Sequence, residues 1–186
     1  MHNQAKSLNR TQISFTTLIL TLLVFGMGMA RAQQITTAVN LVLTDVIYID
    51  PGSAANGGQV DFNYENANDY NSEKTASVPN SLIITFTKPF DLKVKANGEN
   101  FESGSNSIPV NVLSVQCNAS SQINGISTPI ILSTQDQVLI SGADSGYKMN
   151  LDLDYTIAQG RSSSVDILGK PAGNYTQMVT YTATAL

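Results

Sequence analysis

Hydrophobic and polar residues alternate with a period of two along most of the chain after residue 32, a pattern typical of β-strands. It is clearest over residues 147–157, where every second residue is apolar: Tyr147, Met149, Leu151, Leu153, Tyr155 and Ile157. Polar residues lie between them, so we expect one face in the core and the other in water. Residues 90–96 alternate in the same way, and Asn97-Gly98 then predicts a hairpin whose return strand begins near Asn100.

Weaker alternation predicts further strands, which complete an all-β chain. Turn-forming residues separate most of these strands, and no segment after residue 32 has a convincing helical period. Pro89 indicates a short turn or a bend in an edge strand, since proline donates no ladder hydrogen bond. The pattern predicts an immunoglobulin-like, two-sheet antiparallel sandwich of about seven to nine strands. The further strands are expected at residues 38–49, 60–64, 82–87, 108–116, 137–140 and 174–185.

The first of these segments, residues 38–49, is apolar on both faces. Val39, Leu41 and Leu43 share one face, while Val42 and Val46 lie on the other. Such a strand is either central in a sandwich or able to insert into another molecule. We favour a buried internal strand, and insertion stays open as the alternative.

The segment before residue 33 has the organisation of an export signal. Lys6 and Arg10 precede an apolar run at residues 13–29, and Ala30-Arg31-Ala32 gives a small-x-small cleavage pattern. We therefore expect a cleavable signal helix at residues 1–32 and a single domain at residues 33–186. An uncleaved membrane anchor is the weaker alternative. After cleavage we expect no membrane span, and a location in the periplasm, at the cell surface or outside the cell.

Removal of the signal changes the net charge of the chain and the reactive residue types that it contains. The remaining 154 residues (186 minus 32) contain 7 basic residues (10 minus 3) and 14 acidic ones, for a formal charge of −7. That charge disfavours nucleic acid as a partner. Cys117 is the single cysteine, which excludes an internal disulfide, and the only histidine lies in the signal. A serine–histidine triad is then excluded, and we expect no enzyme activity and no cofactor.

The sequence contains two candidate binding sites, one for calcium and one for glycan, and each also has a simpler structural explanation. Asp61, Asn63 and Glu65 place three oxygen-bearing side chains on one strand face, a weak calcium candidate, although the solvated face of an edge strand explains them better. Tyr64 and Tyr70 lie among asparagines and are candidates for glycan contact. The simpler explanation is that Tyr64 belongs to the core and Tyr70 packs against a loop.

The last fourteen residues, from Gly173, form a β-favouring segment in which Tyr175, Val179, Tyr181 and Ala183 are in register. Together with the apolar segment after the signal and the run at residues 89–96, this segment resembles subunits of chaperone–usher pili and the related spore-coat-U-like secreted β-sandwiches. The resemblance implies a sandwich that is incomplete on its own. It also implies that a chaperone grips the final strand through these four residues, and that the N-terminal segment, with Val39, Leu41 and Leu43, completes a neighbouring subunit.

The expected function is therefore that of an exported surface structural or adhesive subunit that assembles by β-strand addition. Its partners would be other protein subunits or a periplasmic chaperone. The alternative is a self-complete secreted β-sandwich that binds cell-surface or cell-wall glycan through Tyr64 and Tyr70.

Overall fold

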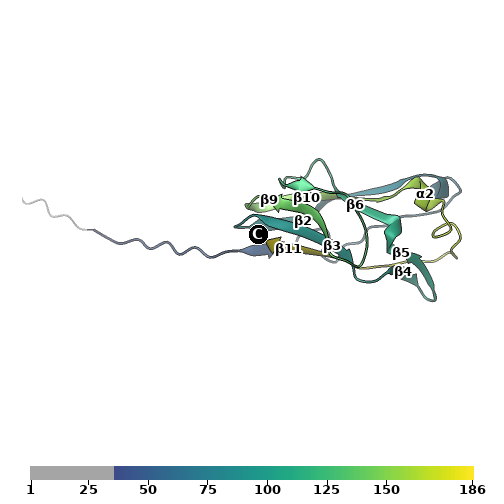
Figure 1. Cartoon of the computed structure of the whole chain (residues 1–186), viewed down its shortest axis with the longest axis horizontal. Helices are drawn as coiled ribbons and strands as arrows, with labels where there is room; N and C mark the ends of the chain where they lie inside the picture. The colour runs from purple at the N-terminus through teal and green to yellow at the C-terminus, as the bar shows by residue number, and fades with distance from the viewer. Residues whose placement is uncertain (1–35) are drawn as a thin grey trace, which may run out of the picture. The chain divides into compact units, whose positions relative to one another are not determined.

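The computed structural model describes residues 36–186, so the expected signal segment lies outside the described residues. Residues 43–186 form one compact unit, and residues 36–42 belong to a separate unit and contain neither helix nor strand. Strands account for 44% of the structure and helices for 7%, and antiparallel sheets form a sandwich-like fold, which confirms the predicted class (Figure 1). Between residues 36 and 186, no helix is long and apolar enough to cross a membrane.

Two antiparallel sheets form the sandwich, and a small hairpin sheet adjoins them. The five-stranded sheet has the order β1 (Ile47–Ile49), β2 (Lys74–Phe86), β10 (Gly146–Ile157), β6 (Leu113–Cys117) and β8 (Ile130–Ile131). The four-stranded sheet has the order β11 (Val179–Ala185), β3 (Phe90–Ala96), β9 (Gln137–Ala143) and β7 (Ile126–Ser127). The hairpin sheet pairs β4 (Asn100–Ser103) with β5 (Asn106–Pro109), and the short helices are η1 (Asp69–Asn71), η2 (Val110–Val112) and α2 (Gln159–Ser162).

The core consists of the inward faces of the two sheets. On β3 every second residue is buried, beginning with Phe90, and on β10 the inward residues include Leu151 and Leu153. The Phe86 and Phe90 rings stack with centroids 4.4 Å apart, so they join the end of β2 to the start of β3. Pro89 lies just before β3, where the chain crosses from one sheet to the other, so the short-turn interpretation of this proline is correct.

Several predicted strands agree closely with the structure. β3 has the predicted bounds, β10 begins one residue before the predicted 147–157 segment, and β4 begins at Asn100. The predicted hairpin is wrong in one respect, because β4 pairs with β5 and not with β3. The neighbours of β3 are β9 and β11 instead, since the turn at Asn97-Gly98 carries the chain out of the sheet.

The predicted strand at residues 38–49 is wrong for its first nine positions, because only Ile47–Ile49 form a strand. β1 runs antiparallel to β2, with Ile47 opposite Phe86, so residues before Ile47 would need a partner beyond Phe86. The Thr87 N–H still donates to the Val46 carbonyl, and the Val46 N–H donates to the side-chain hydroxyl of Thr87. Beyond Thr87 the segment that follows β2 crosses to the other sheet at Pro89, so it cannot pair with residues before Val46. The interpretation as a buried internal strand is therefore wrong.

Three other segments are less regular than predicted, and one of them, residues 108–116, is divided by η2 between β5 and β6. Residues 60–64 form no strand, although Val60, Phe62 and Tyr64 alternate as expected and pack against the core. The final strand begins at Val179 and not at residue 174, and the residues before it form no regular ladder, although Thr176 makes an isolated bridge with Glu102. Alternation thus identifies the inward side chains correctly, but ladder hydrogen bonds depend on a neighbouring strand.

Candidate functional site

The first part of the candidate site is the exposed apolar segment, defined here as residues 39–43. Val39 is 89% exposed, Leu41 81% and Leu43 82%, and Val42 is exposed to the same degree. The segment forms no strand, and within residues 36–186 no other strand pairs with it. Large apolar side chains in series are rarely left in water by a monomeric protein, because their burial is favourable.

The second part is the outer edge of β11, the last strand of the four-stranded sheet (Figure 1). Asn97 donates its N–H to the Met178 carbonyl at one end of the β11–β3 ladder, and Leu186 donates to the Pro89 carbonyl at the other. Backbone groups alternate sides along an antiparallel strand, so even-numbered residues bond to β3. The N–H and C=O groups of the odd-numbered residues face away from β3: Val179, Tyr181, Ala183 and Ala185.

The inward side chains of β11 are less buried than those of its neighbour. Phe90, Leu92 and Val94 on β3 have no exposed surface, whereas Tyr181 and Ala183 on β11 are only half-buried although they pack against the same core. The difference arises because, among the strands of residues 36–186, β11 has β3 as its neighbour on one side and none on the other. A further strand beside β11 would cover these side chains and pair the outward backbone groups.

Tyr181 also connects the two sheets. Its hydroxyl lies 2.5 Å from the hydroxyl of Tyr155 on β10. Burial raises the pKa of Tyr155 and, more strongly, that of Tyr181, since the charged phenolate is disfavoured in the core. The sequence singles out Tyr181 but not its partner, because alternation places Tyr155 on the inward face without indicating what lies opposite.

This pair predicts an alkaline loss of stability. Both folded-state pKa values are raised above the unfolded value of 10, so at high pH the unfolded chain binds fewer protons than the folded one. Stability is then complete below about pH 10 and falls as the pH rises further. We expect Tyr181→Phe to cost about 1 kcal/mol at pH 7, from the lost hydrogen bond, and to flatten the alkaline decline. Urea unfolding at pH 7 and at pH 11 measures both effects, and an equal decline in the two proteins would contradict the prediction.

The four predicted C-terminal residues do not share one strand. Val179, Tyr181 and Ala183 lie in β11, whereas Tyr175 lies before it and donates its hydroxyl to the Pro171 carbonyl at 2.8 Å. The structure thus brings three of the four together on the inward side of one edge strand. Tyr175 instead stabilises the loop that leads to β11.

The predicted glycan residues lie together in a different part of the domain. The Tyr64 and Tyr70 rings are tilted against each other with centroids 4.9 Å apart. The Tyr64 hydroxyl lies 2.8 Å from the hydroxyl of Ser162, which is buried in α2, and the Lys74 ammonium lies 5.5 Å from the Tyr64 ring. Both rings are half-buried, so each has much of its surface occupied by protein neighbours.

The calcium candidates are exposed and are not brought together by a loop. Asp61 accepts a hydrogen bond from Gln59, and the backbone N–H of Glu65 donates to Asp69. The Asp69 carboxylate bonds the Lys74 ammonium as well, and this contact, followed by two backbone N–H groups, lowers the pKa of Asp69 to about 2. No group of three or more acidic, histidine or cysteine side chains with metal-binding geometry occurs in the described part of the chain.

Cys117, at the end of β6, lies partly buried between the sheets. Burial raises the pKa of its thiol, and a hydrogen bond with Ser127 opposes this effect. A thiol with a raised pKa is a poor nucleophile at neutral pH, because the reactive thiolate is scarce.

Comparison with known proteins finds similarity among solved structures but none among families or curated sequences. No known family model matches the sequence, and no curated protein matches it. Among solved structures, a chain from a chaperone–usher pilus, in a study of how the pilus rod uncoils, is similar with 12% identity and a TM-score of 0.37. The match covers 87% of this chain and 100% of that one. At this level of similarity the comparison assigns neither a family nor a function.

Proposed function

We propose that the protein is an exported, non-enzymatic surface structural subunit that joins copies of itself by β-strand addition. In this proposal the exposed apolar segment of one molecule pairs with the outer edge of β11 in another. The observation that carries it is that residues 36–186 combine an apolar segment without a partner strand among them and an edge strand with unpaired backbone groups.

The exposed apolar segment is suited to the role of donor strand. Val39, Leu41 and Leu43 lie two apart, so in an extended conformation they point to one face. Burial of one such side chain contributes about 1.5–3 kcal/mol, and three together offset part of the cost of association. Backbone hydrogen bonds to an edge strand add affinity that does not depend on side-chain identity.

The outer edge of β11 is suited to the role of acceptor. The outward N–H and C=O groups recur at every second residue, at Val179, Tyr181 and Ala183. This spacing matches the hydrogen-bonding repeat of an added antiparallel strand. An inward-facing residue of the donor would lie beside the half-buried Tyr181 and Ala183 and complete their burial.

A free edge and a free apolar segment are also aggregation hazards before assembly. We therefore propose that a periplasmic chaperone covers the β11 edge until a second subunit replaces it. The proposed export signal at residues 1–32 would bring the chain to that compartment.

The acceptor edge is tested by Ala183→Pro. Proline removes the Ala183 N–H, which faces away from β3, so the β11–β3 ladder keeps its hydrogen bonds. We expect a folded protein whose self-association, measured by sedimentation velocity, falls at least tenfold. The matched control is Thr182→Ala, which changes an exposed side chain on the same strand and should associate normally. Unchanged association of Ala183→Pro would show that the β11 edge is not the acceptor.

A further inference from the structure

A bulge in β10 places an aromatic side chain on the outside of the five-stranded sheet. The pairing of β10 with β2 shifts between Gly146 and Met149, so Tyr147 and Lys148 occupy the space opposite a single residue, Thr85. Lys148 has a φ of 47°, a backbone conformation that side-chain-bearing residues rarely adopt, and its N–H donates to the Thr85 hydroxyl at 3.0 Å. Tyr147 is consequently 77% exposed. Bulges and positive φ values of this kind re-aim side chains and concentrate at functional sites.

A second exposed tyrosine lies on the other side of the same threonine. Tyr48 on β1 is directly opposite Thr85, and paired residues of an antiparallel ladder point to the same face. Lys148 reaches across this face, because its ammonium lies 3.8 Å from the Asp50 carboxylate and 5.9 Å from the centre of the Tyr147 ring. Two phenol rings, a hydroxyl and an ammonium from three adjacent strands are thus gathered with the carboxylate of Asp50, which directly follows β1.

We propose that this surface, formed by Tyr48, Asp50, Thr85, Tyr147 and Lys148, binds a neutral saccharide. A sugar ring has an apolar face of C–H groups, which packs against an aromatic ring, and a rim of hydroxyls, which needs both donors and acceptors. The exposed tyrosines supply the first, and Lys148 with Asp50 supplies the second. The opposite charges of this pair compensate each other, which disfavours a strongly charged ligand.

This ligand class fits the surface better than a protein partner does. The tyrosines are interrupted by the exposed ammonium of Lys148, and charged residues are depleted at the centre of protein interfaces. The surface belongs to the five-stranded sheet, whereas the proposed acceptor edge, β11, belongs to the four-stranded one. Saccharide binding at this surface therefore does not use the proposed acceptor edge.

Titration calorimetry with three neutral probes, chitohexaose, laminarihexaose and mannohexaose, tests the proposal on the chain without residues 1–32. We expect at least one probe to bind with a dissociation constant below about 1 mM, and Tyr147→Ala to weaken that binding about tenfold. Tyr48→Ala should weaken it as well. Both side chains lie on the surface, so both variants should keep the wild-type melting temperature.

Tyr70→Ser is the matched control, because it alters the other tyrosine cluster and should leave saccharide binding unchanged. Three results would overturn the proposal. They are the absence of binding by all three probes, binding that Tyr70→Ser removes and Tyr147→Ala does not, and a Tyr147→Ala variant that loses self-association while its saccharide binding is unchanged. The last result would identify the surface as a contact between subunits.

Discussion

A chain that carries Leu41→Asp and Leu43→Asp is expected to fold normally and to lose self-association. Both leucines are more than 80% exposed, so their replacement removes no contact from the sandwich core. In the proposed assembly both are buried against a second molecule, where an unpaired carboxylate carries a desolvation penalty of several kcal/mol. Sedimentation velocity should show monomers at concentrations at which the wild-type chain assembles.

The control for this variant places the same charges on the opposite face of the segment. Asn40 and Thr44 alternate with the leucines, and Asn40→Asp with Thr44→Asp adds two carboxylates that an added strand would direct to solvent. This control should assemble to nearly the wild-type extent. Equal loss of assembly in both variants would indicate a general effect of charge, and unchanged assembly of the leucine variant would exclude the segment as donor.

The largest expected loss of stability follows from Phe90→Ala. Phe90 has no exposed surface, stacks on Phe86, and lies where the chain passes from the five-stranded to the four-stranded sheet. Its removal leaves a cavity that rigid strands on both sides cannot fill, so the free energy of unfolding should fall by about 3–5 kcal/mol. Urea unfolding monitored by far-ultraviolet circular dichroism measures this change.

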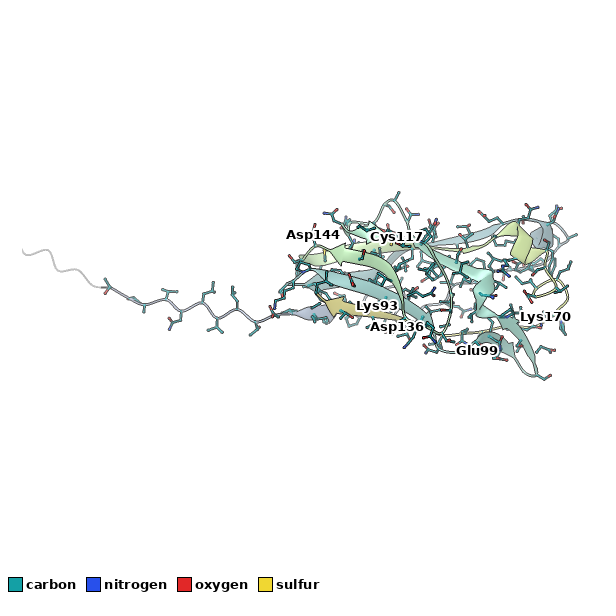
Figure 2. The ribbon with its side chains drawn as sticks, in the orientation of Figure 1. Lys93, Glu99, Cys117, Asp136, Asp144 and Lys170 are labelled. Carbon is teal, nitrogen blue, oxygen red and sulfur yellow. The ribbon has the colours of Figure 1, made fainter. Side chains whose placement is uncertain are left out.

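Lys93→Ala is the matched control on the same strand. Lys93, which is labelled in Figure 2, alternates with the buried residues of β3, so its side chain points to the outward face of the sheet. Its replacement should change the free energy of unfolding by no more than about 0.5 kcal/mol. A loss below about 1 kcal/mol for Phe90→Ala would contradict the packing described for the crossing between the sheets.

Alternation in the sequence predicts β3 and β10 well because both strands are flanked by paired neighbours on either side. Their polar and apolar positions then correspond directly to the outward and inward faces of the sheet. Residues 38–46 have an equally clear pattern and form no strand, since β2 ends at Phe86 and provides no partner. A local pattern specifies which side chains share a face, and tertiary pairing decides whether a ladder forms.

The candidate site likewise combines features that the local sequence pattern predicts with contacts that depend on tertiary structure. The sequence singles out Val179, Tyr181 and Ala183 as one inward set, and the structure places all three on β11. The sequence gives no indication that Tyr181 contacts Tyr155, because that contact depends on how the two sheets are stacked. Alternation predicts Tyr147 on the core face, and this prediction is wrong because the bulge in β10 exposes the side chain.

Amide hydrogen exchange along β11 is the most direct measurement of strand addition at this edge. The N–H groups of Thr180, Thr182 and Thr184 bond to β3, so they should be protected in the monomer and in the assembled form alike. Those of Tyr181 and Ala183 face outward, so they should exchange rapidly in the monomer and become protected on assembly. Rapid exchange of Tyr181 and Ala183 in the assembled protein would contradict strand addition at β11.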